Sequence, residues 1–195
     1  MKTSVSLLLA LSTFSASALD LNPRFALVDS DGIVLRNPYF VDGDKKYSVI
    51  LNTETELSPY EDGALFKFIK FDHAEMRLRP SAFSVEVKFG TDTLDRYQEA
   101  ARKLLPQIAE GVVLEREVKN PLPINKWESH RFVYKYTIPS GAVRESITFL
   151  NITPAQQVIV QVYAMEKNFQ EASWRGDDII RRWHELNPST VLRGN

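Results

Sequence analysis

The fold is decided by residues 127–165, WESHRFVYKYTIPSGAVRESITFLNITPAQQVIVQVYAM, where apolar and polar side chains alternate along three successive segments. In the first segment Tyr134 and Tyr136 alternate with charged or smaller neighbours, and the same period returns in 143–150 and 158–164. A period of two places successive side chains on opposite faces of a β-strand. Because short polar turns separate the segments, we expect a three-stranded antiparallel meander.

Two helices are predicted beside this meander. One follows it directly over 168–186, where Asn168 and Glu171 have the spacing of a reciprocal N-terminal cap. The other covers 91–108 and should kink or end near Pro106, which lacks a backbone N–H. Apolar residues recur at three- and four-residue steps in both. The stripes are Leu94, Tyr97, Ala101, Leu104, Leu105 and Ile108 in the first helix, and Phe169, Ala172, Gly176, Ile179, Ile180 and Trp183 in the second.

The rest of the chain predicts further strands joined by loops. Helices that are separated by antiparallel runs do not build a parallel βαβ series, so doubly wound folds and barrels are excluded. We expect one α+β domain over 19–188, a twisted antiparallel sheet covered by two main helices, with a tail over 189–195. The further expected elements are a hairpin over 25–35, strands over 46–51, 64–71, 75–79, 83–89 and 112–118, and loops over 37–44 and 52–63.

The first eighteen residues have the features of a secretory signal peptide. Lys2 gives a positive start, the apolar run Val5–Leu11 follows, and Ala16-Ser17-Ala18 supplies a small-residue cleavage site. The run is far shorter than the roughly 20 residues that cross a bilayer, so cleavage near Ala18 is favoured over a membrane span. We therefore expect export to the periplasm or the extracellular space.

Composition excludes several classes of partner and site. Cleavage removes Lys2, so 23 of the 24 basic residues remain beside 25 acidic ones, and this balance gives no general attraction to nucleic acid or anionic lipid. The chain has no Cys, which excludes disulfides, thiolate metal sites and a lipid anchor on cysteine. A chain of this size can fold on its hydrophobic core alone.

No catalytic or cofactor signature is found in the sequence. His73, His130 and His184 lie too far apart along the chain for zinc-ligand spacing, and the HExxH and G-x-S-x-G motifs are absent. The eight glycines are scattered, which excludes a phosphate-binding glycine loop. We expect no catalytic residue, no cofactor and no metal. The acidic pairs, which are typical of solvated surfaces, are Glu54/Glu56, Glu61-Asp62 and Asp177-Asp178.

Four aromatic residues are candidates for a contact patch. Tyr39, Tyr60, Trp127 and Tyr163 fall in predicted loops or on strand faces that the predicted core does not use. Aromatic side chains are enriched where proteins bind partners. An envelope protein or a small apolar ligand is the expected partner.

The order of elements resembles the Mog1/PsbP-like group, in which helices sandwich a twisted antiparallel sheet. The resemblance rests on residues 144–183, RESITFLNITPAQQVIVQVYAMEKNFQEASWRGDDIIRRW, and on 91–105, TDTLDRYQEAARKLL, at the place of that group's mid-chain helix. It provides no catalytic residues to carry over. It implies an envelope or accessory protein that works by contact and not by catalysis.

Three hypotheses of function follow from these observations. The first is an exported binding or accessory module without chemistry, acting through protein contact. The second is a carrier of a small ligand or lipid, with a cavity between the sheet and the 168–186 helix, where the small Ala172 and Gly176 leave room. The third is a hydrolase whose site, a His and a carboxylate in one cleft, forms only on folding.

Overall fold

A seven-stranded antiparallel sheet forms the frame of the molecule, described here from a computed structural model that covers residues 19–30, 32–122, 128–153 and 155–187. Its strand order is β4-β5-β6-β10-β9-β8-β7, so the predicted meander β8-β9-β10 lies inside the sheet and β10 pairs with β6. The strands are β4 Thr55–Tyr60, β5 Gly63–Phe68, β6 Glu75–Pro80, β7 Glu110–Lys119, β8 Ser129–Ile138, β9 Gly141–Asn151 and β10 Gln157–Met165.

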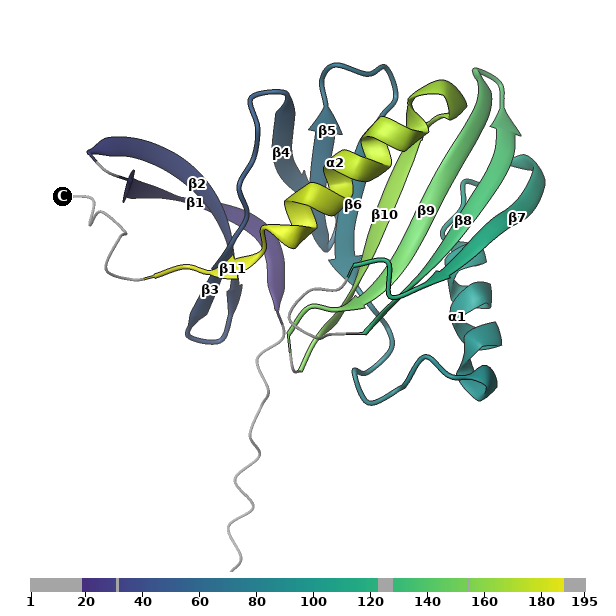
Figure 1. Ribbon diagram of the computed structural model, residues 1–195, viewed down its shortest axis with the longest axis horizontal. Helices are drawn as coiled ribbons and strands as arrows, with labels where there is room; N and C mark the ends of the chain where they lie inside the picture. Colours follow the sequence, from purple (N-terminus) through teal and green to yellow (C-terminus); the bar gives the residue numbers. More distant parts are fainter. Residues whose placement is uncertain (1–18, 31, 123–127, 154, 188–195) are drawn as a thin grey trace, which may run out of the picture.

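A second, smaller sheet has the order β1-β2-β3-β11. Figure 1 shows it beside the large sheet, with the hairpin β1–β2 reaching away from the body of the molecule. The sequence did not predict this separate sheet. Its strands are β1 Asp20–Ser30, β2 Ile33–Asp42, β3 Lys45–Ser48 and β11 His184–Glu185.

The two helices cover opposite faces of the large sheet. Helix α2, Phe169–Arg181, follows a short 3-10 turn and crosses one face, whereas α1, Thr91–Lys103, lies behind the sheet near β7 and β8 (Figure 1). Both faces are buried because strand residues alternate between two cores: on β9, Ile147 packs on the α1 side and Leu150 on the α2 side. This is the α+β single-domain architecture that the sequence predicts.

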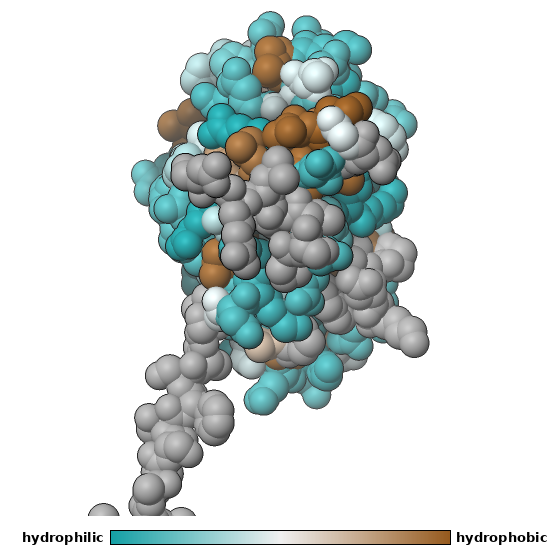
Figure 2. All heavy atoms as spheres, turned by 90° about the vertical axis from the view of Figure 1, so that its left-hand side faces the viewer, coloured by the Kyte–Doolittle hydropathy of each residue, from teal (hydrophilic) through white to brown (hydrophobic). Residues whose placement is uncertain are grey.

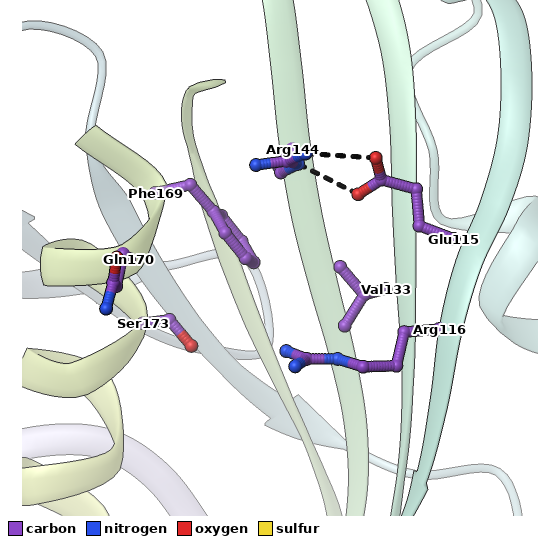
Figure 3. A pocket seen from close by; sticks show the side chains of 7 residues that line it. All are labelled: Glu115, Arg116, Val133, Arg144, Phe169, Gln170 and Ser173. Atoms are coloured by element: carbon purple, nitrogen blue, oxygen red, sulfur yellow. Dashed lines mark hydrogen bonds and ion pairs between the residues drawn. The ribbon is translucent and has the colours of Figure 1, made fainter. Parts of the chain in front are cut away.

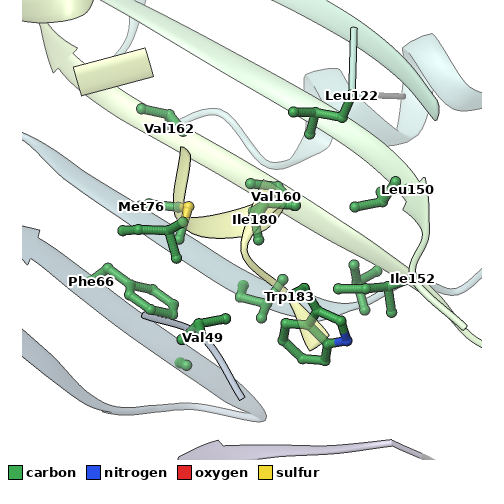
Figure 4. Packing of buried hydrophobic residues seen from close by; sticks show 14 of the residues in the cluster. Val49, Phe66, Met76, Leu122, Leu150, Ile152, Val160, Val162, Ile180 and Trp183 are labelled. Atoms are coloured by element: carbon green, nitrogen blue, oxygen red, sulfur yellow. The ribbon is translucent and has the colours of Figure 1, made fainter. Parts of the chain in front are cut away.

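Trp183 joins the small sheet to the core beneath α2. Its ring stacks on Phe40 and Tyr47, with centroid separations of 5.1 and 5.7 Å. Figure 4 shows Trp183 beside Val49 and Ile152, in the core that α2, the large sheet and the small sheet share. Aromatic pairs of this kind add to the free energy of burying their area.

Several predicted boundaries are wrong, and long-range pairing explains them. The second helix was expected to reach 186, but it ends at Arg181 because His184-Glu185 pairs with β3. The predicted loop 37–44 is largely β2, which pairs with both β1 and β3. The predicted loop 52–63 contains β4, whose Pro59 is tolerated because β4 is an edge strand.

The expected strand over 83–89 is not a strand. Phe83 and Phe89 instead place their rings 4.2 and 4.8 Å from that of Tyr97 on α1. The hydroxyl of Tyr97 donates a hydrogen bond to the carbonyl of Val87, at 2.9 Å. The segment is thus held by side chains, and its alternating pattern reflects contact with α1. Helix α1 is also shorter than expected and ends at Lys103.

Candidate functional site

The hairpin β1–β2, called the arm below, exposes large apolar side chains. Phe25, Leu27, Ile33, Val34 and Leu35 have exposed fractions between 39% and 64%. Figure 2 shows this side of the molecule, where apolar side chains form a band among polar ones. Contiguous apolar surface of this kind marks a contact site in a folded protein.

The apolar side chains lie on both faces of the arm. In the antiparallel register Asp29 pairs with Val34 and Leu27 with Arg36, which puts Leu27 and Val34 on one face. Leu35 pairs with Val28, one residue out of phase, and therefore lies on the other face. Strands that are apolar on both faces are typical of positions covered on both sides.

A polar groove of about 410 Å³ lies between α2 and the β7–β8 side of the sheet. Figure 3 shows Arg144 reaching across to Glu115, with Nε–Oε2 and Nη2–Oε1 distances of 2.8 and 3.1 Å. The register of β7 on β8 shifts between Leu114 and Arg116, at the position of Glu115. The other lining residues are Val133, Phe169, Gln170 and Ser173.

The carrier hypothesis needs space under α2, and the helix is packed tightly there. A Cβ added at Gly176 would lie 2.9 Å from Val162 Cγ2 and 3.3 Å from Met76 Sδ. The small residue therefore serves close packing of the helix on the sheet. The groove beside the helix has Val133 and Phe169 in its lining, but charged and polar side chains make up the rest, which does not suit a lipid.

A second cavity, of about 290 Å³, lies on the α1 face and contains a buried carboxyl group, Glu145. Glu145 is 1% exposed. The Tyr136 hydroxyl donates a hydrogen bond to its Oε2 at 2.5 Å, and Gln161 Nε2 donates to its Oε1. We call this space the Glu145 cavity. It is lined by His73, Glu75, Arg77, Pro106, Ile108, Ile138, Glu145, Gln161 and Tyr163.

The surroundings of the Glu145 cavity shift the pKa values of its acids. Burial raises the pKa of Glu145 above its ordinary value of 4.5, although hydrogen bonds from Tyr136 and Gln161 and the charge of Arg77 act to lower it. Burial and the neighbouring Glu145 also raise the pKa of Tyr163 and of Tyr136. The site therefore favours the neutral forms of its acids.

Glu145 was missed in the sequence, although its strand carries a signal. Val143, Ile147 and Phe149 share one face of β9, and Glu145 lies in the same alternation. Gln161 likewise interrupts the alternation of Ile159 and Tyr163 on β10. A polar residue at an apolar position of a buried strand predicts a partnered polar group. Only the fold shows that these two residues are partners.

The structure places the predicted contact tyrosines in two regions. Tyr39 lies half-buried in the small sheet, with Lys46 Nζ 5.2 Å from its ring centroid. Tyr60 and Tyr163 both lie near Arg77: the Arg77 guanidinium is 5.0 Å from the Tyr60 ring, and Tyr163 lines the same cavity as Arg77. Trp127 lies outside the described residues, so the four-residue patch stays a prediction.

The three histidines have different surroundings. His184 is exposed on β11, with its Nδ1 2.8 Å from the Arg182 carbonyl oxygen. His73 is exposed at the Glu145 cavity, which also holds Glu75. His130 is buried, with its Nε2 2.9 Å from Glu117 Oε1 and its ring centroid 5.8 and 5.1 Å from those of Phe89 and Phe132. The described residues contain no cluster of three or more His, Asp or Glu that could hold a metal ion. Each Glu145 oxygen accepts one hydrogen bond, from Tyr136 and from Gln161, and neither comes from His73, which does not favour a His73–Glu145 acid–base pair.

Buried polar contacts also connect α2 to the sheet. Arg131 on β8 makes a bidentate ion pair with Asp177 on α2, with Nη1–Oδ2 and Nη2–Oδ1 distances of 3.1 and 2.5 Å. Its Nε donates to Thr148 Oγ1 at 2.7 Å. Asp177 is thus structural, whereas its neighbour Asp178 pairs with the half-exposed Arg182. Neither helix in the described part of the chain has the length and apolar character of a membrane span.

Comparison with known proteins gives similarity of structure only. No protein-family model matches the chain, and no curated protein matches its sequence. The solution structure of cyanobacterial PsbP from Synechocystis sp. PCC 6803 is similar over 92% of this chain and 99% of that one, with 8% identity and a TM-score of 0.46. The crystal structure of a Pseudomonas aeruginosa protein of unknown function is similar over 84% of this chain and 96% of that one, with 13% identity and a TM-score of 0.40.

Proposed function

We propose that the chain is an exported binding module whose arm docks into a slot on a partner protein. The observation that carries this proposal is the presence of exposed apolar side chains on both faces of a projecting hairpin. A patch on one face would suit a flat contact. A ribbon that is apolar on both faces loses its exposed apolar area only when both faces are covered.

The chemistry of the arm favours a protein partner over a lipid bilayer. At the tip of the arm, the backbone N–H of Gly32 donates a hydrogen bond to Asp29 Oδ1 at 2.8 Å. A carboxylate is costly to place in the apolar part of a membrane, and the tip would enter first. Arg36 lies over the Phe25 ring, 4.1 Å from its centroid, and so adds a cation to the apolar face. Mixed aromatic and arginine surfaces are typical of protein contacts.

The features of residues 1–18 support the export part of the proposal. These residues lie outside the described part of the structure, so the expectation rests on the charged start, the short apolar run and the Ala-x-Ala site. An envelope protein exposed to the same compartment is the corresponding partner class.

Site-specific photo-crosslinking in the cell of origin tests the docking geometry. A photo-crosslinking amino acid replaces Leu27 on one face, Leu35 on the other, or Ile69, an exposed apolar residue outside the arm. We expect the same partner protein to be captured from Leu27 and Leu35 and not from Ile69. Capture from Ile69 as well, or from neither face, would contradict the proposal.

Binding to the purified partner then tests the energetics. Leu27→Asp and Leu35→Asp should each weaken the Kd about tenfold or more, whereas Ile69→Asp should leave it nearly unchanged. An adduct between two copies of this chain, or flotation of the purified chain with anionic phospholipid vesicles, would instead assign the arm to self-association or to a membrane and overturn the proposal.

A further inference from the structure

We infer that the Glu145 cavity binds a small aliphatic amine as its ammonium ion, held between the Glu145 carboxylate and the side-chain oxygen of Gln161. This site is separate from the arm and does not depend on the proposed docking. The evidence comes from one unpartnered acceptor, the charges of the lining and its apolar residues.

The unpartnered acceptor is Gln161 Oε1. The Gln161 side chain is 3% exposed, and its Nε2 donates to Glu145 and, at 3.4 Å, to the Leu104 carbonyl. Its Oε1 has no hydrogen-bond partner among the described residues, and the residue lines the cavity. Buried acceptors are nearly always satisfied, so a ligand that donates N–H groups would complete this one.

The charges of the lining favour a cation with several donors. Arg77 is paired with Glu75 through Nη2, which compensates part of its positive charge, and its buried Nε has no hydrogen-bond partner among the described residues. Glu145 is the buried acid of the lining. An anionic ligand would meet the carboxylates of both glutamates. An ammonium group carries three N–H donors and no acceptor, which fits the Glu145 oxygens and Gln161 Oε1.

Part of the cavity lining is apolar. Pro106, Ile108 and Ile138 form this part, and the cavity of about 290 Å³ has room for a short aliphatic chain. His73 and Ile108 are both exposed at the cavity, which gives a small molecule a route from solvent. A lysine side chain of another protein has the same ammonium and alkyl chemistry as a free amine.

Binding should release a proton. Burial raises the pKa of Glu145, so an incoming ammonium ion must displace the carboxyl proton, which goes to solvent, before the ion pair forms. Affinity should therefore rise as the pH rises through the Glu145 pKa. The groups around Glu145 are Tyr134 and Tyr136 on the adjacent β8, Gln161 and Tyr163 on the adjacent β10, and Glu75 and Arg77 on β6, beyond β10. His73 also lines the cavity.

Titration of the purified, isotope-labelled chain, followed by NMR, tests the assignment without any mutation. We expect n-butylammonium to cause saturable shifts of the backbone amides of Glu145, Gln161 and Tyr163, with a Kd that falls as pH rises. Butanol and butyrate, of similar size, should cause none. Absence of saturable shifts with the amine, or equal binding of butanol, would overturn the inference.

Two variants and a second probe sharpen the test. Glu145→Gln keeps the size of the side chain and should weaken binding about tenfold or more, the loss expected for a charge-assisted hydrogen bond. Ser146→Ala, on the opposite face of the same strand, is the matched control and should bind the amine as the parent does. If Glu145→Gln also binds the amine as the parent does, the proposed site is refuted. A lysine blocked at both backbone ends should bind as well as butylammonium if the natural ligand is a side chain, and more weakly if it is a free amine.

Discussion

The contact between Arg131 and Asp177 should contribute strongly to stability, and removing Asp177 measures how much. The side chains of Arg131 and Asp177 are 7% and 13% exposed. Both Nη atoms of the guanidinium donate hydrogen bonds to the carboxylate. Asp177→Ala leaves the guanidinium under α2 with only Thr148 Oγ1 as its partner. Breaking a buried ion pair by removing one member costs about 3–5 kcal/mol. We expect about 3 kcal/mol, because the helix edge allows some hydration of the pair.

Asp178→Ala is a closely matched control for this change. Asp178 is the next residue on the same helix and pairs with Arg182, at an Nε–Oδ2 distance of 2.9 Å, but these side chains are 34% and 48% exposed. An exposed pair contributes less than about 1 kcal/mol. Both changes remove one negative charge near the C-terminal end of α2 and replace Asp by Ala, so helix propensity and dipole effects largely cancel between the two variants.

Urea unfolding followed by circular dichroism gives the free energy of unfolding of each variant. A loss of about 3 kcal/mol corresponds to a decrease in Tm of roughly 6–12 °C for a domain of this size. In an Arg131→Met background Asp177→Ala should cost almost nothing, because no unpaired guanidinium remains. A loss below about 1 kcal/mol for Asp177→Ala, or one equal to that of Asp178→Ala, would refute the conclusion that this pair is a buried connection between helix and sheet.

Two further predictions follow from the packing and the titration of the core. Gly176→Ala should lower the free energy of unfolding by about 1 kcal/mol or more, because the new Cβ would lie 2.9 Å from Val162 Cγ2. This clash should outweigh the higher helix propensity of alanine. A variant that is more stable in urea unfolding would show that the helix can move away from the sheet. Glu145 has a raised pKa in the folded state, so the native protein holds a proton that the unfolded chain has lost, and stability falls as pH rises above about 4.5 through that raised pKa. Glu145→Gln removes this dependence, so its urea midpoint should rise relative to the parent between acid and neutral pH, and a constant difference would contradict the predicted titration.

The sequence alone determines the parts of the fold that depend on local periodicity. The meander β8-β9-β10 could be predicted because alternating side chains and short turns favour antiparallel neighbours whatever surrounds them. The two helices could be predicted because their apolar stripes have helical spacing, and so could the α+β class, which follows from their order. The same periodicity wrongly predicted a strand over 83–89. The apolar side chains of that segment pack against α1, and the segment is not a strand.

Only the tertiary structure decided the features that form between residues far apart in the chain. His184-Glu185 becomes a strand because β3 is beside it, and Trp183 packs against Phe40 and Tyr47 in the small sheet. The Glu145 cavity forms because β6, which is distant in sequence, pairs with β10 and so brings its side chains to the acid. No local pattern encodes such a pairing, since it depends on which strand edges and apolar faces remain to be covered once the whole chain has folded.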